Sequence, residues 1–508
     1  MKFYCDKEGP IVHTDKGALR GYLFNGIYQF RGVDYAKAKR FGLPEEIDAF
    51  EGVRDAFHYG SVCPTMFPDS PAGDIMSPHR VWFQDENCLN LNIWTPSLSP
   101  DQKLPVVVWF HGGGFFAGSA IEQYAYDGEN MSRQGNVVVV TVNHRLNVLG
   151  FLDLRGFGEK YERSCNAGTF DLIAALRWIR NNIAGFGGDA DQVTIFGQSG
   201  GGGKVISLLQ MQEADGLFHR ALIMSGTLGT LMTDHDYDMR PVIKKTLSGL
   251  GFGEDEVEKL ETVPYRELVS AYLTAYRELI SDKGIPFFGP IRNQDYAGDP
   301  VKAGFTEHAK TIPVMIGSTY SEFFHSKYKE EQKTDEEMTG IIKEQFGEAQ
   351  GGQLIEAFRQ AYPGKPLCDI YAADSAAFRY EVKKWVHERA KAGAAGTYEY
   401  LFTLEFPFNG GTPAWHCSDI PFFFHNLDKA PVVNIEGVSD RLRDQMFDAF
   451  IQFVRTGKPD TKLLPEWPAC TAEDEATMIF DRECEVRHHY DDAFIKLHYD
   501  LNVAPMMF

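Results

Sequence analysis

Short, continuously apolar runs rich in β-branched residues recur along the chain. Residues 104–110 read LPVVVWF and residues 136–142 read NVVVVTV. Runs of this length and composition are typical of strands buried on both faces of a mostly parallel sheet. Residues 192–196 (QVTIF) predict a third such strand, and residues 312–316 and 397–402 predict later strands of the same sheet.

The apolar spacing between these strands changes to that of helices. Apolar residues recur every three to four positions over residues 170–182, and residues 205–211 predict a second helix. Alternation of strand and helix predicts a doubly wound α/β core over residues 100–230. The charged stretches 235–280 and 325–395 are expected to be helical excursions over the sheet.

The chain of 508 residues shows no internal repeat and no linker rich in Pro, Gly or Ser, so a single domain over residues 1–508 is expected. Lys and Arg number 50 against 71 Asp and Glu, a net charge of −21. A surface this acidic repels phosphate backbones and anionic lipid headgroups, which argues against nucleic acid as a partner. No apolar run is long enough to span a membrane, so membrane insertion is not expected.

The amino end, residues 1–8, carries acidic residues and no apolar core of a signal peptide, which favours a cytoplasmic protein, or a secreted one if a signal peptide has been removed. Eight cysteines include no CxxC pair, which argues against a zinc ribbon, and no metal is expected. The pattern makes no prediction of an oligomeric state.

A candidate nucleophile lies between the third strand and the helix that follows it. Residues 197–201 read GQSGG and match G-x-S-x-G, which places Ser199 on a sharp strand-to-helix turn. Glycines two residues either side relieve the clashes of that turn. Gly200 to Gly203 followed by Lys204 resembles a phosphate-binding loop, but Gln198 and Val205 break that motif at both ends. Residues 112–117 fit G-x-G-x-x-A only weakly as a dinucleotide signal, so no cofactor is expected.

A glycine-rich loop, His111 followed by three glycines, comes directly after the first buried strand. Its main-chain N–H groups can point into one small volume and hold the oxyanion of a tetrahedral intermediate. The N–H of Gly200, just after the candidate nucleophile, would be a further donor. Together the two motifs predict acyl-transfer chemistry.

A serine nucleophile needs a base, and His416 is the best candidate because it lies in a loop after a late strand. The chain order serine, acid, histidine then places the acid in between. Glu322 follows the strand predicted at residues 312–316 and is favoured, with Asp419 as the local competitor. The other histidines considered are interpreted as structural or solvated: His144, His325, His488 and His489.

Several blocks together resemble the type-B carboxylesterase and cholinesterase family over nearly the whole chain. They are residues 30–36 (FRGVDYA), 87–92 (NCLNLN), 111–115 (HGGGF), 143–146 (NHRL), 186–201 and 218–226. The resemblance implies an α/β-hydrolase fold, with a large, mostly parallel central sheet flanked by helices and helical excursions on the active-site side. It assigns the nucleophile, acid and base to Ser199, Glu322 and His416, and the oxyanion donors to Gly113, Gly114 and Gly200.

The resemblance also implies buried ion pairs and a disulfide. The ion pairs would join Arg40 to Glu86 and Arg145 to Asp171 as scaffold, and the disulfide would join Cys63 to Cys88, although in a cytosol that pair would stay reduced. Two departures stand out: Gln198 replaces the usual glutamate, which weakens the case for a cationic substrate, and Gly200 replaces alanine while keeping its N–H.

We therefore expect a serine esterase that hydrolyses small-molecule carboxylic esters of small to medium acyl and alcohol groups through an acyl-serine intermediate. Phe115, Phe116, Trp415 and residues 422–424 are candidates for an apolar acyl pocket, with core packing as the alternative. Two other functions stay open. One is a lipase-like or acyl-transfer activity in the same fold, and the other is a non-catalytic binding protein.

Overall fold

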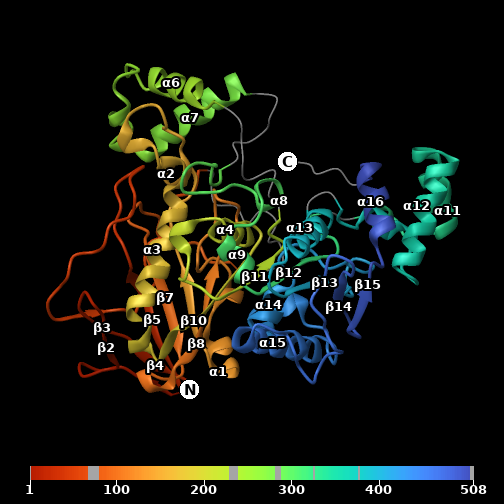
Figure 1. Ribbon diagram of the computed structural model, residues 1–508, viewed down its shortest axis with the longest axis horizontal. Coiled ribbons are helices and arrows are strands. Elements are labelled where there is room, and N and C mark those ends of the chain that lie inside the picture. Colours follow the sequence, from red (N-terminus) through yellow and green to blue (C-terminus); the bar gives the residue numbers. More distant parts are fainter. Residues whose placement is uncertain are drawn as a thin grey trace.

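The computed structural model describes residues 2–66, 79–227, 238–280, 288–323, 326–375 and 378–503. Its centre is a twelve-stranded sheet in the order β1-β4-β5-β7-β9-β8-β10-β11-β12-β13-β14-β15, and β2, β3 and β6 form a separate small sheet (Figure 1). The strands are β1 (Phe3–Tyr4), β2 (Ile11–His13), β3 (Ala18–Arg20), β4 (Tyr22–Phe24), β5 (Ile27–Asp34), β6 (Val53–Asp55), β7 (Asn90–Thr95), β8 (Leu104–Phe110), β9 (Val138–Val142), β10 (Gly188–Gln198), β11 (Arg220–Met224), β12 (Val314–Thr319), β13 (Thr397–Phe402), β14 (Ala476–Phe480) and β15 (Glu485–His488).

The middle of the large sheet is parallel, as the apolar runs predicted. Strands β9, β8, β10, β11, β12, β13 and β14 pair parallel to one another, whereas β1, β4, β5 and β7 pair antiparallel on one side and β15 on the other. The α/β-hydrolase fold with a large, mostly parallel sheet is therefore confirmed. Because parallel strands end at a common edge, the loops after β8, β10, β11, β12 and β13 lie together.

The α-helices of the described residues are α1 (Glu129–Gly135), α2 (Asn147–Phe151), α3 (Ala167–Asn182), α4 (Gly200–Leu209), α6 (Arg240–Gly249), α7 (Tyr265–Leu279), α8 (Pro300–Ala303), α9 (Glu307–Thr311), α10 (Lys327–Glu330), α11 (Asp335–Phe346), α12 (Glu348–Ala361), α13 (Arg379–Lys391), α14 (Ile420–Phe423), α15 (Ser439–Thr456) and α16 (Asp492–Asp500). The predicted excursions contain α6 and α7 in one stretch and α10 to α13 in the other, and Figure 1 shows α6, α7, α11 and α12 away from the sheet. Residues 235–237, 325 and 376–377 of these stretches lie outside the described residues.

Two apolar cores cover the two faces of the sheet, because successive residues of a strand point to opposite sides. In β8, Val106 and Val108 join the core that contains residues of α3 and α4. Val107 and Trp109 join the other core, which contains residues of α15. All four side chains are fully buried. The unbroken apolar run of β8 therefore reflects burial on both faces.

The boundaries of the predicted elements differ from the structure where glycine or a turn intervenes. β8 and β13 cover the predicted residues, whereas β9 begins at Val138 because Asn136 adopts a left-handed conformation that ends α1. Helix α4 begins at Gly200, five residues earlier than predicted, since four glycines obscure the helical pattern. The polar-looking segment β7 was not predicted at all.

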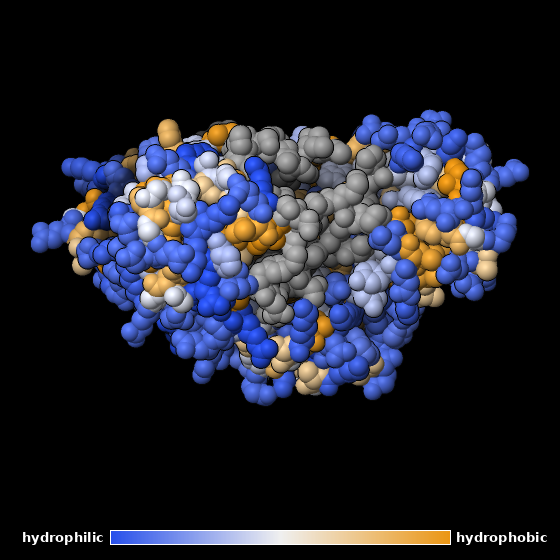
Figure 2. Space-filling model, turned by 90° about the horizontal axis from the view of Figure 1, so that it is seen from above, coloured by the Kyte–Doolittle hydropathy of each residue, from blue (hydrophilic) through white to orange (hydrophobic). Residues whose placement is uncertain are grey.

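The surface is largely hydrophilic on the face shown in Figure 2, in keeping with the net charge of −21. Among the residues that the structure describes, no helix combines the length and the apolar character needed to cross a membrane.

Candidate active site

Ser199 lies on the turn between β10 and α4, in strained backbone geometry. Its φ is 58° and ψ is −126°, values that a non-glycine residue seldom adopts, and its N–H donates to the carbonyl of Met224 at 2.8 Å. The flanking glycines are required sterically. A methyl group added at Gly197 would lie 2.5 Å from the main chain of Gly201, and one at Gly201 would lie 2.0 Å from the carbonyl oxygen of Phe110.

The glycine loop lies against the turn that carries Ser199, so the main-chain N–H groups of Gly113, Gly114 and Gly200 are close to the candidate nucleophile. Gly113 and Gly114 have φ values of 80° and 62°, and a methyl group added at Gly200 would lie 2.1 Å from the carbonyl oxygen of Gly114. Within the described parts of the chain, the N–H groups of Gly113, Gly114 and Gly200 donate to no protein acceptor. The free N–H group at the start of α4 and the two free N–H groups of the glycine loop can donate hydrogen bonds to a developing oxyanion.

Glu322 and His416 are brought together by the loops after β12 and β13. The Glu322 Oε2 lies 2.5 Å from Nδ1 of His416, and the N–H of His416 donates to the carbonyl of Glu322 at 2.9 Å. Because a carboxylate only accepts, this contact places the proton on Nδ1 and leaves Nε2 as the basic nitrogen. Glu322 is itself fixed, because its Oε1 accepts from the hydroxyl of Ser225 at 2.6 Å and from the N–H of Thr319 at 2.8 Å.

Ser199 and His416 are linked through the residue before the serine. The amide nitrogen of Gln198 lies 3.3 Å from Nδ1 and 3.2 Å from Nε2 of His416, so it sits over the face of the imidazole. In the part of the chain that the structure describes, the Ser199 hydroxyl and the imidazole form no direct hydrogen bond. Such contacts often tighten only when substrate binds. The sequence identified Gln198 as a departure but not as a contact of the base.

Two aromatic rings pack against the imidazole of His416. The ring of Phe323 lies 4.1 Å away between centroids, and that of Phe378 is stacked at 5.4 Å with an interplanar angle of 20°. Phe323 follows Glu322 directly and is 45% exposed. Neither ring was predicted at the site, since Phe378 begins a helical stretch with no motif and Phe323 has no periodic context.

Asp419, the competing acid, has a different partner. Its Oδ2 accepts from the hydroxyl of Tyr400 at 2.9 Å, and within the described residues it makes no hydrogen bond to His416. Burial and the nearby charge of Glu322 raise the pKa of Asp419 to about 7. The geometry therefore favours Glu322 as the partner of the imidazole.

The predicted pocket residues lie in different environments. Phe115 is 1% exposed and packs edge-to-face on Phe151 at 5.2 Å, whereas Phe116 is half-buried. Trp415, next to His416, is also half-buried and packs against Phe406 at 4.7 Å.

Residues 422–424 do not belong to a substrate pocket in this structure. All three phenylalanines are fully buried, and Phe424 packs on Trp109 at 5.0 Å within the core beneath the sheet. The prediction that they line an acyl pocket is therefore wrong, because the helical turn α14 directs them towards α15 and the strands.

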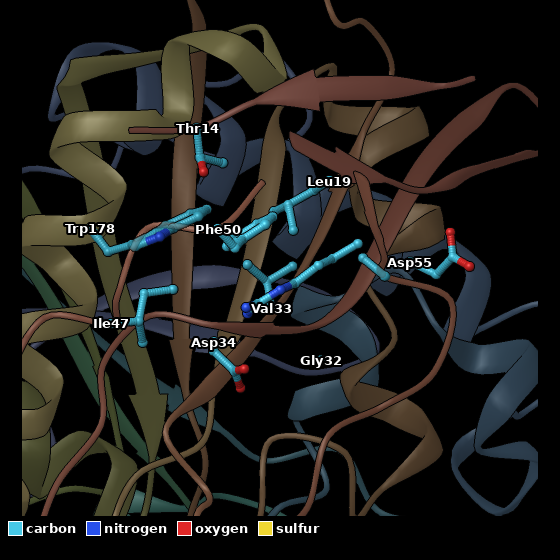
Figure 3. Close-up of a pocket in the computed structure, with 11 residues that line it drawn as sticks. Thr14, Leu19, Gly32, Val33, Asp34, Ile47, Phe50, Asp55 and Trp178 are labelled. Carbon is cyan, nitrogen blue, oxygen red and sulfur yellow. The ribbon is translucent and has the colours of Figure 1, made fainter. Parts of the chain in front are cut away.

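Two cavities lie outside the cluster of Ser199, Glu322 and His416. One, of about 240 Å³, adjoins the glycine loop and is lined in part by Trp82, Ser119 and Glu122. The other, of about 100 Å³, lies between Trp178 and Phe50 near the small sheet (Figure 3).

One cluster of three acidic residues is neutralised by neighbouring cations. Glu475, Asp491 and Asp492 are the only described group of acids, histidines or cysteines spaced for a metal ion. Lys383 contacts all three, and it lies 2.9 Å from Asp491. Burial would raise the pKa of Asp491, but Arg379 and Lys383 hold it well below its ordinary value. An ion-pair network explains the cluster without a metal.

The scaffold contacts implied by the resemblance are present for both ion pairs. The side chain of Arg145 donates two hydrogen bonds of 2.6 and 2.8 Å to Asp171, with both side chains buried, and the Arg40 Nε donates to Glu86 at 2.6 Å. Cys63 and Cys88 are both buried and free, so no disulfide joins them in this structure.

Of the other histidines considered, those that the structure describes differ in their environments. His488 and His489 are exposed and pair with Asp474 and Asp492, as expected of solvated residues, while His144 is buried and His325 lies outside the described residues.

Comparisons with known proteins agree on one family. The sequence model of the Carboxylesterase family matches residues 8–497. The chain is 33% identical to the para-nitrobenzyl esterase of Bacillus subtilis, over 94% of this chain and 96% of that protein, and 32% identical to the phenmedipham hydrolase of Pseudarthrobacter oxydans, over 93% and 95%. A solved structure of an esterase from Clostridium hathewayi that hydrolyses aliphatic aromatic polyesters is 50% identical, with a TM-score of 0.94 over 98% of this chain and 99% of that one.

Proposed function

This chain belongs to the carboxylesterase family and is a carboxylic ester hydrolase, and from that premise we propose that Ser199, His416 and Glu322 carry out its reaction. The observation that carries the proposal is the contact of 2.5 Å between Glu322 and Nδ1 of His416, made beside the turn that presents Ser199. A carboxylate at Nδ1 orients the imidazole and stabilises its protonated form.

In the proposed mechanism, Nε2 of His416 accepts the proton of the Ser199 hydroxyl as the oxygen attacks the ester carbonyl. The carbonyl oxygen becomes an oxyanion that accepts hydrogen bonds from the N–H groups of Gly113, Gly114 and Gly200. His416 then donates its proton to the leaving alcohol, and an acyl-serine remains. A water molecule, deprotonated by the same nitrogen, attacks the acyl carbon, and the acid and the free serine are released.

The amide of Gln198 must yield Nε2 to the serine hydroxyl when substrate binds. The amide nitrogen of Gln198 lies 3.2 Å from Nε2, over the face of the imidazole and not in the ring plane. Rotation of the Gln198 side chain is therefore enough to free Nε2 for the serine hydroxyl. A neutral amide here also leaves the site without the negative charge that would favour cationic alcohols. We therefore propose neutral esters with small to medium acyl and alcohol groups as substrates.

The relatives support an aromatic alcohol or acid portion, since their names refer to para-nitrobenzyl esters and aliphatic aromatic polyesters. The half-exposed ring of Phe323 beside His416 provides an aromatic surface for such a group.

Hydrolysis of p-nitrophenyl acetate, butyrate and palmitate, with p-nitrobenzyl acetate as a fourth ester, tests this function. We expect the highest kcat/KM on acetate or butyrate and a low value on palmitate. A preference for palmitate supports the lipase-like alternative, and methanol-dependent formation of methyl esters supports acyl transfer. Absence of turnover on all four esters from pH 6 to 9 supports a non-catalytic binding protein.

A further inference from the structure

Lys204 is a fully buried lysine whose role neither the fold nor the proposed mechanism explains. It lies on α4, five residues after Ser199, and 0% of the residue is exposed. Lysine is almost never fully buried without a partner, since burial removes the hydration of its charge. In the sequence it completes the run of four glycines that superficially resembles a phosphate-binding loop.

The partner of Lys204 is the loop that supplies the oxyanion donors. Its Nζ donates to the main-chain carbonyl of His111 at 2.8 Å, and it lies 5.9 Å from the centre of the Phe115 ring. These two residues flank Gly112, Gly113 and Gly114. Lys204 therefore joins the helix that carries the N–H of Gly200 to the loop that carries the other two donors.

The two donor segments depend on this spacing because they touch main chain to main chain. A methyl group added at Gly200 would lie 2.1 Å from the carbonyl oxygen of Gly114, and Gly201 approaches Phe110 just as closely. Contacts this close leave no side chain between the segments to hold them in place. Lys204 lies one helical turn after Gly200 on α4, and its hydrogen bond to the carbonyl of His111 fixes the distance between α4 and the glycine loop.

We propose that Lys204 is a positioning residue for ester hydrolysis, which fixes the loop 112–114 against helix α4 through the His111 carbonyl and places a buried positive charge behind the oxyanion site. The inference rests on the proposed function. A positive charge in a buried site favours the negatively charged intermediate over the neutral ester, so it contributes to the rate and not merely to binding.

The charge of Lys204 depends on pH near neutrality. Burial lowers its pKa to about 7, although Glu122 and Cys63 act in the opposite direction. The other titratable groups facing it are His111 and His144, whose rings pack together at 5.3 Å between centroids. Burial, and secondly the charge of Lys204, lower the pKa of both, so they are neutral at neutral pH. Lys204 therefore differs from His111 and His144 in that its charge changes near neutral pH.

The test compares wild type with Lys204→Met, which keeps the length and the burial of the side chain, and with Lys391→Met on the surface as the matched control. We expect kcat/KM of Lys204→Met on p-nitrophenyl acetate to fall about 10- to 100-fold at pH 6.5, somewhat less than for removal of a direct oxyanion donor. The inhibition constant of a trifluoromethyl ketone should rise by the same factor while KM changes little. Titration with a fluorophosphonate counts the competent sites, so misfolded protein is not mistaken for slow catalysis.

The pH profile separates the positioning role from a merely structural one. Wild-type kcat/KM should decline above neutral pH as Lys204 loses its proton, and Lys204→Met should lack that decline. If the decline persists unchanged in the variant, it belongs to another group such as Asp419, and the inference is wrong. Wild-type rates in Lys204→Met, or no decline in wild type up to pH 9, also overturn it. In contrast, a wild type that hydrolyses no ester overturns the proposed function itself.

Discussion

Replacement of Gly200 by alanine tests whether the amide donors of the glycine loop and of helix α4 need their present spacing. The added methyl carbon would lie 2.1 Å from the carbonyl oxygen of Gly114 and 2.4 Å from its Cα. Ordinary contact begins at 3.4 Å, so the segments must separate by up to 3.4 − 2.1 = 1.3 Å. Both partners are main chain, and no rotation of a side chain can relieve the overlap.

A displacement of about 1 Å at a reacting centre costs about 100-fold in rate, so kcat/KM of Gly200→Ala should fall by about that factor. Gly203→Ala is the matched control on the same helix, because its methyl group would lie 3.3 Å from the Phe115 ring, a contact that a small shift relieves. The assay is hydrolysis of p-nitrophenyl acetate, normalised by fluorophosphonate titration. Wild-type kcat/KM in Gly200→Ala would refute the reasoning, and an equal loss in both variants would attribute the effect to the helix as a whole.

Three further predictions concern the acid, the scaffold and the buried lysine. Glu322→Gln should lower kcat by about 10³- to 10⁴-fold with little change in the unfolding midpoint, because the imidazole loses its orienting carboxylate; a loss below tenfold would contradict that role. Asp171→Ala should lower the free energy of unfolding in urea by about 3–5 kcal/mol, since it leaves Arg145 buried and unpaired; a change below 1 kcal/mol would contradict it. Lys204→Met should raise the free energy of unfolding at pH 6 by about 2–4 kcal/mol, because lowering the pKa from 10.5 to about 7 costs about 5 kcal/mol and the lost hydrogen bond offsets part of the gain. That gain is complete below pH 7 and shrinks as the pH rises towards 10.5, so a difference independent of pH would contradict it.

Most strands of the parallel part of the sheet were predictable because burial on both faces demands unbroken apolar runs, as in β8 and β13, whereas the parallel strands β11 and β14 were not predicted. The antiparallel part was not predictable, and β7 shows why. Its Asn92 is fully buried, donates to the hydroxyl of Thr141 at 3.1 Å and accepts from the N–H of Gly32 at 3.0 Å. The hydrogen-bond partners of Asn92 lie 49 and 60 residues away along the chain. The polar residues of the segment 90–92 therefore could not be predicted to be buried from their neighbours in the sequence.

In the candidate site, too, features set by neighbouring residues were predictable, whereas contacts between distant segments were not. The turn at Ser199 and the glycine loop were predictable because each has a local backbone requirement. The pairing of Glu322 with His416 followed from chain order and the resemblance. The contacts of Gln198 and Phe378 with the imidazole depend on how loops after different strands meet, and no spacing along the chain encodes them.

The central claim is that Ser199 is the residue that becomes acylated. Mass spectrometry of the protein after reaction with a fluorophosphonate tests it most directly, by locating the adduct in the peptide that contains residue 199. We predict one adduct per chain at Ser199, with no adduct in Ser199→Ala and full labelling in the surface variant Lys391→Met. An adduct on another residue, or stoichiometric labelling of Ser199→Ala, would contradict the account.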